Sequence, residues 1–159
     1  YDPGNFVYPF GAYIAVVEVD PENGSVTMKK FLTCDDCGNI INPMIVEGQI
    51  HGGLAQGIGQ AILENASYSE TGQLNTSSLM DYALPRADDL PMYDLSSNVT
   101  PCPHNPLGAK GCGEAGTIGS TPAVVNAVID ALSPLGVKDL EMPLSPPRVW
   151  SAIQSAKSA

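Results

Sequence analysis

Residues 42–64 decide the fold of this chain, and they read Asn42-Pro-Met-Ile-Val-Glu-Gly-Gln-Ile-His-Gly-Gly-Leu-Ala-Gln-Gly-Ile-Gly-Gln-Ala-Ile-Leu-Glu64. An Asn followed by a Pro is typical of a helix start, because Asn caps the first turn and Pro fits the first helical position. Behind them, apolar side chains recur at steps of three and four residues, which predicts an amphipathic helix as far as Glu64. The apolar positions are Ile45, Val46, Ile50, Leu54, Ile58, Ala61 and Ile62.

This predicted helix is rich in glycine, a residue that destabilises helix interiors by up to about 1 kcal/mol relative to Ala. Its five glycines are Gly48, Gly52, Gly53, Gly57 and Gly59. Two interpretations remain open: the helix packs closely on a neighbouring helix or sheet, or its backbone comes close to a bound cofactor. Gln49 lies among these glycines and could donate a hydrogen bond to a ligand that rests on the bare backbone.

The remaining elements predict an α+β fold in one domain, residues 1–159, with β-hairpins or a mixed sheet packed against two longer helices. Residues 11–20 and 25–33 alternate as strands around the turn Pro21-Glu-Asn-Gly24, which predicts a hairpin. A further strand is expected over 73–83. Ser120-Thr-Pro122 predicts the start of a helix over 123–132, and a last short helix follows over 145–153. The proline-punctuated stretch 84–110 is expected to be a functional or partner-supported loop.

Charge and composition exclude several classes of function. The 159 residues carry 7 Lys and Arg against 17 Asp and Glu, a formal net charge of −10, so binding to nucleic acid or to anionic lipid would begin against repulsion. No apolar run approaches the roughly 20 residues of a bilayer span, and no secretory signal opens the sequence, so we expect a cytoplasmic protein. Charged residues make up only 15%, and the first residue is Tyr1, which favours a piece of something larger that faces another polypeptide.

The segment Cys34-Asp-Asp-Cys37 has the spacing of a redox or zinc motif. Two carboxylates lie between the thiols and would raise their pKa, which is the wrong direction for a reactive pair. A zinc site needs two further ligands, and Cys102, His104 and Cys112 do not form a second tight pair. We therefore expect ordinary buried thiols and no metal bound directly by the protein.

The segment Gly111-Cys-Gly-Glu-Ala-Gly116 matches a dinucleotide-binding pattern, which also requires a strand directly before it. What precedes is Pro101-Cys-Pro-His-Asn-Pro106, which cannot be a central strand, and the helix is expected only from Pro122. A nicotinamide or flavin site is thus disfavoured. Glu114 in this loop has two interpretations: an exposed glutamate, or a poorly solvated carboxylate whose pKa rises so that it accepts a proton near neutrality.

Two long ordered motifs together point to a family. They are Asp35-Asp-Cys-Gly-Asn-Ile-Ile-Asn-Pro43 with Val46 to Gln60, and Lys110-Gly-Cys-Gly-Glu-Ala-Gly-Thr-Ile-Gly-Ser-Thr-Pro-Ala-Val-Val-Asn126. They resemble the C-terminal part of the molybdenum-cofactor (large) subunit of the xanthine oxidase and aldehyde oxidase family, above all its carbon monoxide dehydrogenase-like members. The resemblance extends from Phe10 to Ile153.

This resemblance implies a molybdopterin-dependent oxidoreductase whose cofactor is molybdopterin cytosine dinucleotide with Mo. By the same comparison Gln49 hydrogen-bonds the cofactor, the loop backbone at Gly111, Cys112 and Gly113 borders it, and Glu114 is the general base beside Mo. It further implies iron–sulfur and FAD cofactors on partner subunits, which carry the electrons away. Glycine backbone and free N–H groups would let so acidic a chain hold an anionic ligand without Lys or Arg.

The resemblance leaves the substrate open. A complete subunit of this kind is several times longer, so its N-terminal part is an expected partner, and this chain is expected to be inactive alone. Without that part, oxidation of carbon monoxide is not separated from hydroxylation of an aldehyde or an N-heterocycle. A stand-alone interaction module that retains the fold without catalysis is the alternative from a different class.

Overall fold

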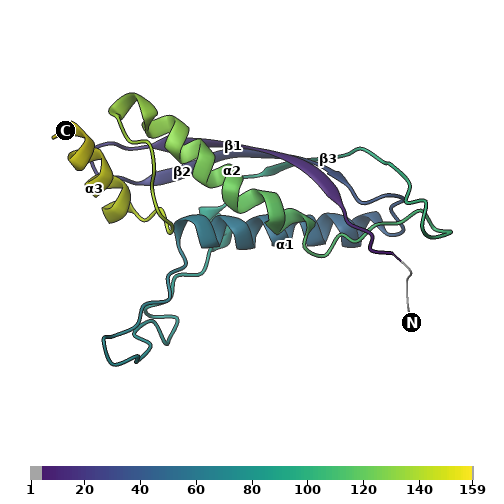
Figure 1. The fold of residues 1–159 in the computed structure, drawn as a ribbon, viewed down its shortest axis with the longest axis horizontal. Helices are drawn as coiled ribbons and strands as arrows, with labels where there is room; N and C mark the ends of the chain where they lie inside the picture. The colour runs from purple at the N-terminus through teal and green to yellow at the C-terminus, as the bar shows by residue number, and fades with distance from the viewer. Residues whose placement is uncertain (1–4, 159) are drawn as a thin grey trace.

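The computed structural model describes residues 5–158, and its sheet has three strands in the order β1-β2-β3 (Figure 1). Strands β1 (Phe10–Val19) and β2 (Val26–Asp36) form the predicted antiparallel hairpin. The turn between them contains Gly24 at φ 78°, a left-handed conformation that glycine adopts without strain. Strand β3 (Tyr93–Ser97) pairs with β2 in parallel, with Phe31 opposite Tyr93.

Two expectations for the middle of the chain are wrong. The strand predicted over 73–83 does not form: apart from an isolated bridge between Tyr68 and Leu74, this region is irregular and mostly exposed. It lies in a segment that projects away from the body after α1 (Figure 1), so its alternating residues have no neighbouring strand to pair with. Conversely, the stretch 84–110 contains the short 3-10 helix η1 (Ala87–Asp89) and also β3, which forms by pairing with β2.

Helix α1 (Pro43–Ile62) confirms the expected element almost to its ends. Asn42 lies just before it in an extended conformation, and its side-chain oxygen accepts a hydrogen bond from the Ile45 N–H at 3.3 Å. This cap satisfies one of the donors that a helix leaves unpaired in its first turn.

Helix α2 (Ala115–Leu132) begins eight residues before the expected range 123–132, so Pro122 lies inside it. An interior proline removes a backbone hydrogen bond and costs about 3 kcal/mol or more. The extra turns bury Ala115, Gly116 and Ser120, and this packing offsets the proline. The dinucleotide-binding pattern of residues 111–116 therefore ends in the first turn of a helix, but no strand lies directly before it.

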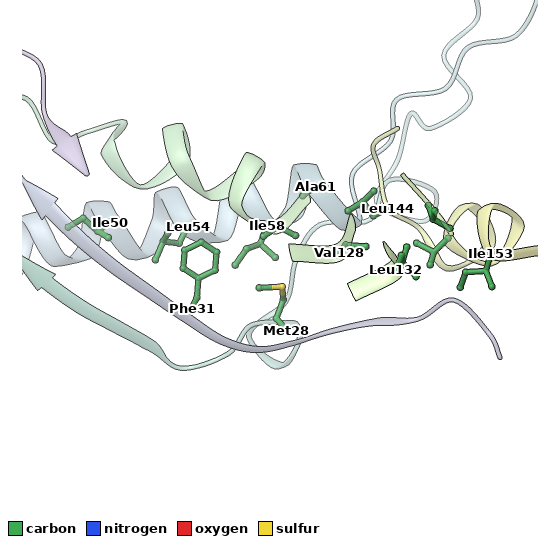
Figure 2. Close-up of a cluster of buried hydrophobic side chains, with 13 residues drawn as sticks. Met28, Phe31, Ile50, Leu54, Ile58, Ala61, Val128, Leu132, Leu144 and Ile153 are labelled. Carbon is green, nitrogen blue, oxygen red and sulfur yellow. The ribbon is translucent and has the colours of Figure 1, made fainter. Parts of the chain in front are cut away.

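The core lies between one face of the sheet and the helices, and the 3-10 helix η2 (Ser133–Leu135) and helix α3 (Pro146–Lys157) close one end (Figure 2). Phe31 of β2 is fully buried against α1, and α3 adds Val149 and Ile153. By length and apolar composition, residues 115–135 would suffice for a membrane span. Val124, Val128 and Leu132 in this stretch are nevertheless completely buried, as in a helix that packs within a protein. The α+β class is confirmed.

Candidate functional site

The loop of residues 111–114 joins Lys110 to the start of α2 and lies beside Gln49 of α1. A Cβ built on Gly113 would lie 3.9 Å from the Gln49 side-chain oxygen. Gln49 and the predicted loop residues, more than 60 positions apart in the sequence, are thus brought together. Glu114 is the residue before the first turn of α2 and its side chain makes no capping hydrogen bond. In the described chain Glu114 is exposed, so of its two interpretations the structure supports the exposed one.

The backbone of this loop offers unused hydrogen-bond donors. Within residues 5–158, the N–H groups of Gly111, Cys112, Gly113 and Glu114 make no hydrogen bond. They stand directly before the N-terminus of α2, a helix of 18 residues. The positive end of the helix dipole and four free donors make this a suitable place for an anionic group.

Four of the five glycines of α1 fall into two groups, and the fifth, Gly59, lies close to Glu64 and Pro85. Gly53 and Gly57 face α2: a Cβ on Gly53 would lie 2.8 Å from the Thr117 nitrogen, and one on Gly57 would lie 1.9 Å from Ser120 Oγ. The interpretation as close helix packing is confirmed for these two. Gly48 and Gly52 have no described atom within 4 Å of a Cβ position, which leaves an open stretch of helix backbone beside Gln49.

An ion pair holds the start of the loop. Lys110 Nζ lies 2.8 Å from Asp36 Oδ2, and both side chains are largely buried. The other oxygen of Asp36 accepts hydrogen bonds from the N–H groups of Gly38 and Thr100, at 2.9 and 3.1 Å. Lys110 and these N–H groups hold the pKa of the Asp36 carboxyl well below its usual range. Asp36 is therefore ionised and joins three separate segments.

A second contact holds the end of the loop. The Tyr13 hydroxyl of β1 bonds to Asp35 of β2 and lies 2.7 Å from the carbonyl oxygen of Ala115, the first residue of α2. Asp35 is almost fully buried, and within the described residues its second oxygen has no hydrogen-bond partner. Burial, together with Asp35, raises the pKa of Tyr13 above its ordinary value, so the hydroxyl keeps its proton.

The cysteines behave as isolated thiols. Cys37 and Cys102 are buried, Cys34 and Cys112 are half-buried, and all four are free. Burial raises the pKa of Cys37 to about 11, with smaller contributions from Cys112 and the carboxylates of Asp35 and Asp36. The carboxylates act in the direction expected from the sequence, but burial is the larger cause. Within residues 5–158 no group of three or more potential ligands gathers around a point where a metal ion could bind.

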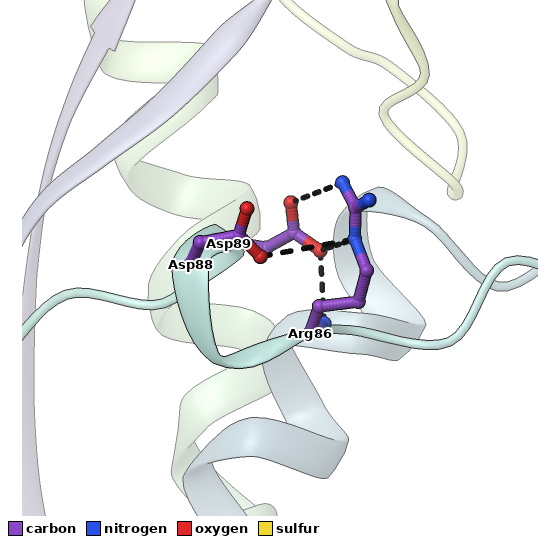
Figure 3. A network of polar contacts seen from close by, with 3 residues as sticks. All are labelled: Arg86, Asp88 and Asp89. Atoms are coloured by element: carbon purple, nitrogen blue, oxygen red, sulfur yellow. Dashed lines mark hydrogen bonds and ion pairs between the residues drawn. The ribbon is translucent and has the colours of Figure 1, made fainter.

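One exposed charged cluster takes no part in this site. The guanidinium of Arg86 bonds to both oxygens of Asp89, at 3.2 and 3.3 Å, and lies 3.8 Å from Asp88 (Figure 3). The Arg86 N–H also donates to Asp89 at 2.8 Å, which closes the η1 turn. In the described chain the hydrogen-bond partners of this arginine lie within its own turn.

Comparison with known proteins gives the geometry a context. The family model of the molybdopterin cofactor-binding domain matches residues 1–91. Two curated relatives are the carbon monoxide dehydrogenase large chain of Hydrogenophaga pseudoflava, 46% identical over 97% of this chain, and the nicotine 6-hydroxylase large subunit of Paenarthrobacter nicotinovorans, 42% identical over 96%. The chain spans about a fifth of the length of these relatives, 19% of each.

A solved structure supports the same relationship. The crystal structure of the Cu,Mo-CO dehydrogenase superposes with a TM-score of 0.95 and 41% sequence identity. The match covers 99% of this chain and 20% of that one. The arrangement of sheet and helices described above is therefore the arrangement found in one part of a much longer chain.

Proposed function

Because the chain belongs to the molybdopterin cofactor-binding domain family, we propose that it forms the C-terminal cofactor-binding and active-site part of a molybdenum hydroxylase large subunit of the carbon monoxide dehydrogenase type. The observation that carries this proposal is the meeting of Gln49, on the open glycine face of α1, with Gly113 in a loop of free backbone donors.

The residues present suit molybdopterin cytosine dinucleotide. Gly48 and Gly52 leave the backbone of α1 open where a Cβ would otherwise project, so a bulky planar ligand can lie close to the helix. The N–H groups of residues 111–114 and the positive end of α2 suit its phosphates. In this proposal Gln49 donates a hydrogen bond to the cofactor, and Gly111, Cys112 and Gly113 contribute main-chain contacts only.

The bound cofactor would supply the two-electron oxidation of the substrate. Glu114 would act as general base and accept a proton at a carboxylate oxygen, a role typically worth 10²- to 10⁴-fold in rate. It is exposed in the described chain, and the remaining part of the large subunit would cover it. For this reason the chain alone is expected to be inactive.

The proposed partners follow from the family. They are the N-terminal part of the large subunit, an iron–sulfur subunit and a flavin subunit that carries FAD. The iron–sulfur and flavin subunits would receive the electrons. The substrate is a small molecule: carbon monoxide, or in the alternative an aldehyde or an N-heterocycle. Four free cysteines suit a reducing compartment, which supports a cytoplasmic location.

The decisive variant is Glu114→Gln in the cofactor-loaded large subunit. Gln keeps the shape of the side chain and its capacity to hydrogen-bond, but it does not accept a proton at neutral pH. Turnover is expected to fall by about 10²- to 10⁴-fold, while metal analysis finds the same Mo content. The matched control is Glu70→Gln, at an exposed position in the projecting segment, and it is expected to change neither quantity.

Two results would overturn the proposal in different ways. Turnover above about a tenth of the wild-type rate in Glu114→Gln would remove Glu114 as the base and leave the loop as a cofactor wall. Absence of Mo from the wild-type large subunit, expressed together with its cofactor-synthesis machinery, would instead favour the stand-alone interaction module.

A further inference from the structure

We propose that the consecutive residues Asp35 and Asp36 are positioning residues that fix the two ends of the 111–114 loop and thereby place the Glu114 carboxylate. This inference rests on the proposed function, in which that loop is the active-site loop. It gives a role to the two carboxylates of the Cys34–Cys37 segment, where a redox or zinc role is not supported.

The argument begins with the geometry of a strand. Successive side chains of a β-strand point to opposite faces of the sheet. At the end of β2, Asp36 therefore reaches one face and meets Lys110, the residue directly before the loop. Asp35 reaches the other face and meets Tyr13, whose hydroxyl contacts the carbonyl of Ala115, the residue directly after the loop. Two adjacent residues thus control both ends of a segment of four.

The two carboxyl groups are both buried but differ in how fully their oxygens are partnered. Asp35 is 1% exposed and Asp36 is 8% exposed, and burying a carboxyl group is costly unless it has partners. Asp36 has three donors, from Gly38, Thr100 and Lys110. The backbone adds to this anchor, since the Lys110 N–H donates to the Cys37 carbonyl at 2.9 Å.

Apart from the two anchors, the end of the loop is held by the first turn of α2, where the Glu114 carbonyl accepts hydrogen bonds from the N–H groups of Thr117 and Ile118 at 3.1 and 3.2 Å. Within residues 5–158 the four backbone N–H groups of the loop make no hydrogen bond, and the Glu114 side chain does not cap α2. The Cys112 carbonyl accepts only from Ala115 within the same turn, at 3.2 Å. Residues 111–113 therefore depend mainly on the two anchors for their conformation, and a change in either anchor is transmitted to Glu114 at the start of α2.

The test uses the cofactor-loaded large subunit and two variants. Asp36→Asn combined with Lys110→Met removes the first anchor without leaving an unpartnered buried charge. Asp35 reaches the end of the loop only through the Tyr13 hydroxyl, so Tyr13→Phe disconnects Asp35 from Ala115. The variant keeps the Tyr13 ring, which packs closely against Gly119. The control is Asp94→Asn, which breaks the exposed ion pair of Lys30 and Asp94 on the same sheet.

Two measurements are made on each protein. Amide hydrogen exchange is followed at Lys110, Ala115 and Thr117, whose N–H groups are hydrogen-bonded next to the loop. Exchange at these amides is expected to accelerate at least about tenfold in the variant of the nearby anchor, with little change in α1 or β1. With carbon monoxide, benzaldehyde or nicotine as reductant and a dye as electron acceptor, kcat is expected to fall on the order of 10- to 100-fold at unchanged KM and Mo content. The Asp94→Asn control is expected to match the wild type in both.

The outcomes separate this inference from the proposed function. If the anchor variants match Asp94→Asn while Glu114→Gln abolishes turnover, the positioning role is wrong and the proposed function stands. Exchange that accelerates evenly through the whole chain also overturns the positioning role, because it reports general destabilisation. If only the amides next to the loop exchange faster but Glu114→Gln retains turnover, the anchors are established and the proposed role of Glu114 fails.

Discussion

Gly53 of α1 and Gly116 of α2 meet backbone to backbone where the two helices cross. A Cβ on Gly53 would lie 2.9 Å from the Gly116 Cα, and a Cβ on Gly116 would lie 2.5 Å from the Ile50 carbonyl oxygen. Gly53 follows Gln49 by one helical turn, and Gly116 follows Glu114 by two residues. The crossing therefore sets how closely Gln49 approaches the 111–114 loop.

Substitution at this crossing is expected to destabilise the fold. Gly53→Ala forces the helices apart and should lower the free energy of unfolding by about 1–3 kcal/mol. The neighbouring Gly52→Ala enters open space and should raise it by up to about 1 kcal/mol, because Ala favours the helix. Urea unfolding of the cofactor-free protein measures both changes. Equal stabilities for the two variants would contradict the close crossing.

The predicted cofactor contact of Gln49 has its own test in the complete large subunit. Gln49→Ala removes a hydrogen bond to an anionic ligand, worth about 1–3 kcal/mol. Mo content per chain should therefore fall more than turnover per bound Mo. Gln73→Ala, at an exposed position in the projecting segment, is the control and should change neither. Full Mo content with collapsed turnover would move Gln49 from cofactor binding to catalysis.

The Asp36 carboxyl predicts how stability depends on acid. Its pKa in the folded protein lies below the ordinary value of 3.8, so the stabilisation is complete above that value and is lost as the pH falls below it. Between about pH 5 and pH 3 the wild type should lose stability more steeply than the double variant Asp36→Asn with Lys110→Met. Urea midpoints at the two pH values measure this slope. Parallel slopes would show that the ion pair contributes nothing to acid sensitivity.

The four thiols are expected to differ in their reactivity toward a thiol reagent, according to how deeply each is buried. With a pKa of about 11, Cys37 is ionised to about one part in a thousand at pH 8 and is also covered. A thiol reagent should therefore modify the half-buried Cys34 and Cys112 in the native protein and reach Cys37 and Cys102 only after unfolding. Mass spectrometry of the labelled peptides identifies the sites. Rapid native labelling of Cys37 would contradict its placement.

Local signals predicted the parts of the fold that form locally. The β1–β2 hairpin carries its own turn, and α1 carries its own cap at Asn42, so both were found from the sequence. Strand β3 was missed because its five residues become a strand only by pairing with β2. The start of α2 was misplaced because Pro122 is a strong local signal that packing against α1 overrides.

The candidate site divides in the same way. Gln49 and the loop at Gly113 were found through ordered motifs, and the structure brings them together. The anchors were not found, because nothing in the spacing of Tyr13 and Ala115, or of Asp36 and Lys110, signals that the two members of each pair meet. These contacts form only because the end of β2 presents Asp36 to Lys110 on one face of the sheet and Asp35 to Tyr13 on the other. This arrangement exists only once the sheet has assembled.

The hydrogen bonds that hold the loop join positions far apart in the chain: 102 residues separate Tyr13 from Ala115, and 74 separate Asp36 from Lys110. On the ribosome, β1 and β2 can pair as soon as they emerge, but the surface that Gln49 shares with Gly113 does not exist until α2 has been translated and has folded back. A nascent chain that ends before α2 therefore has no site for an anionic ligand. Under the proposed function, cofactor insertion would therefore be confined to the time after this segment has left the ribosome.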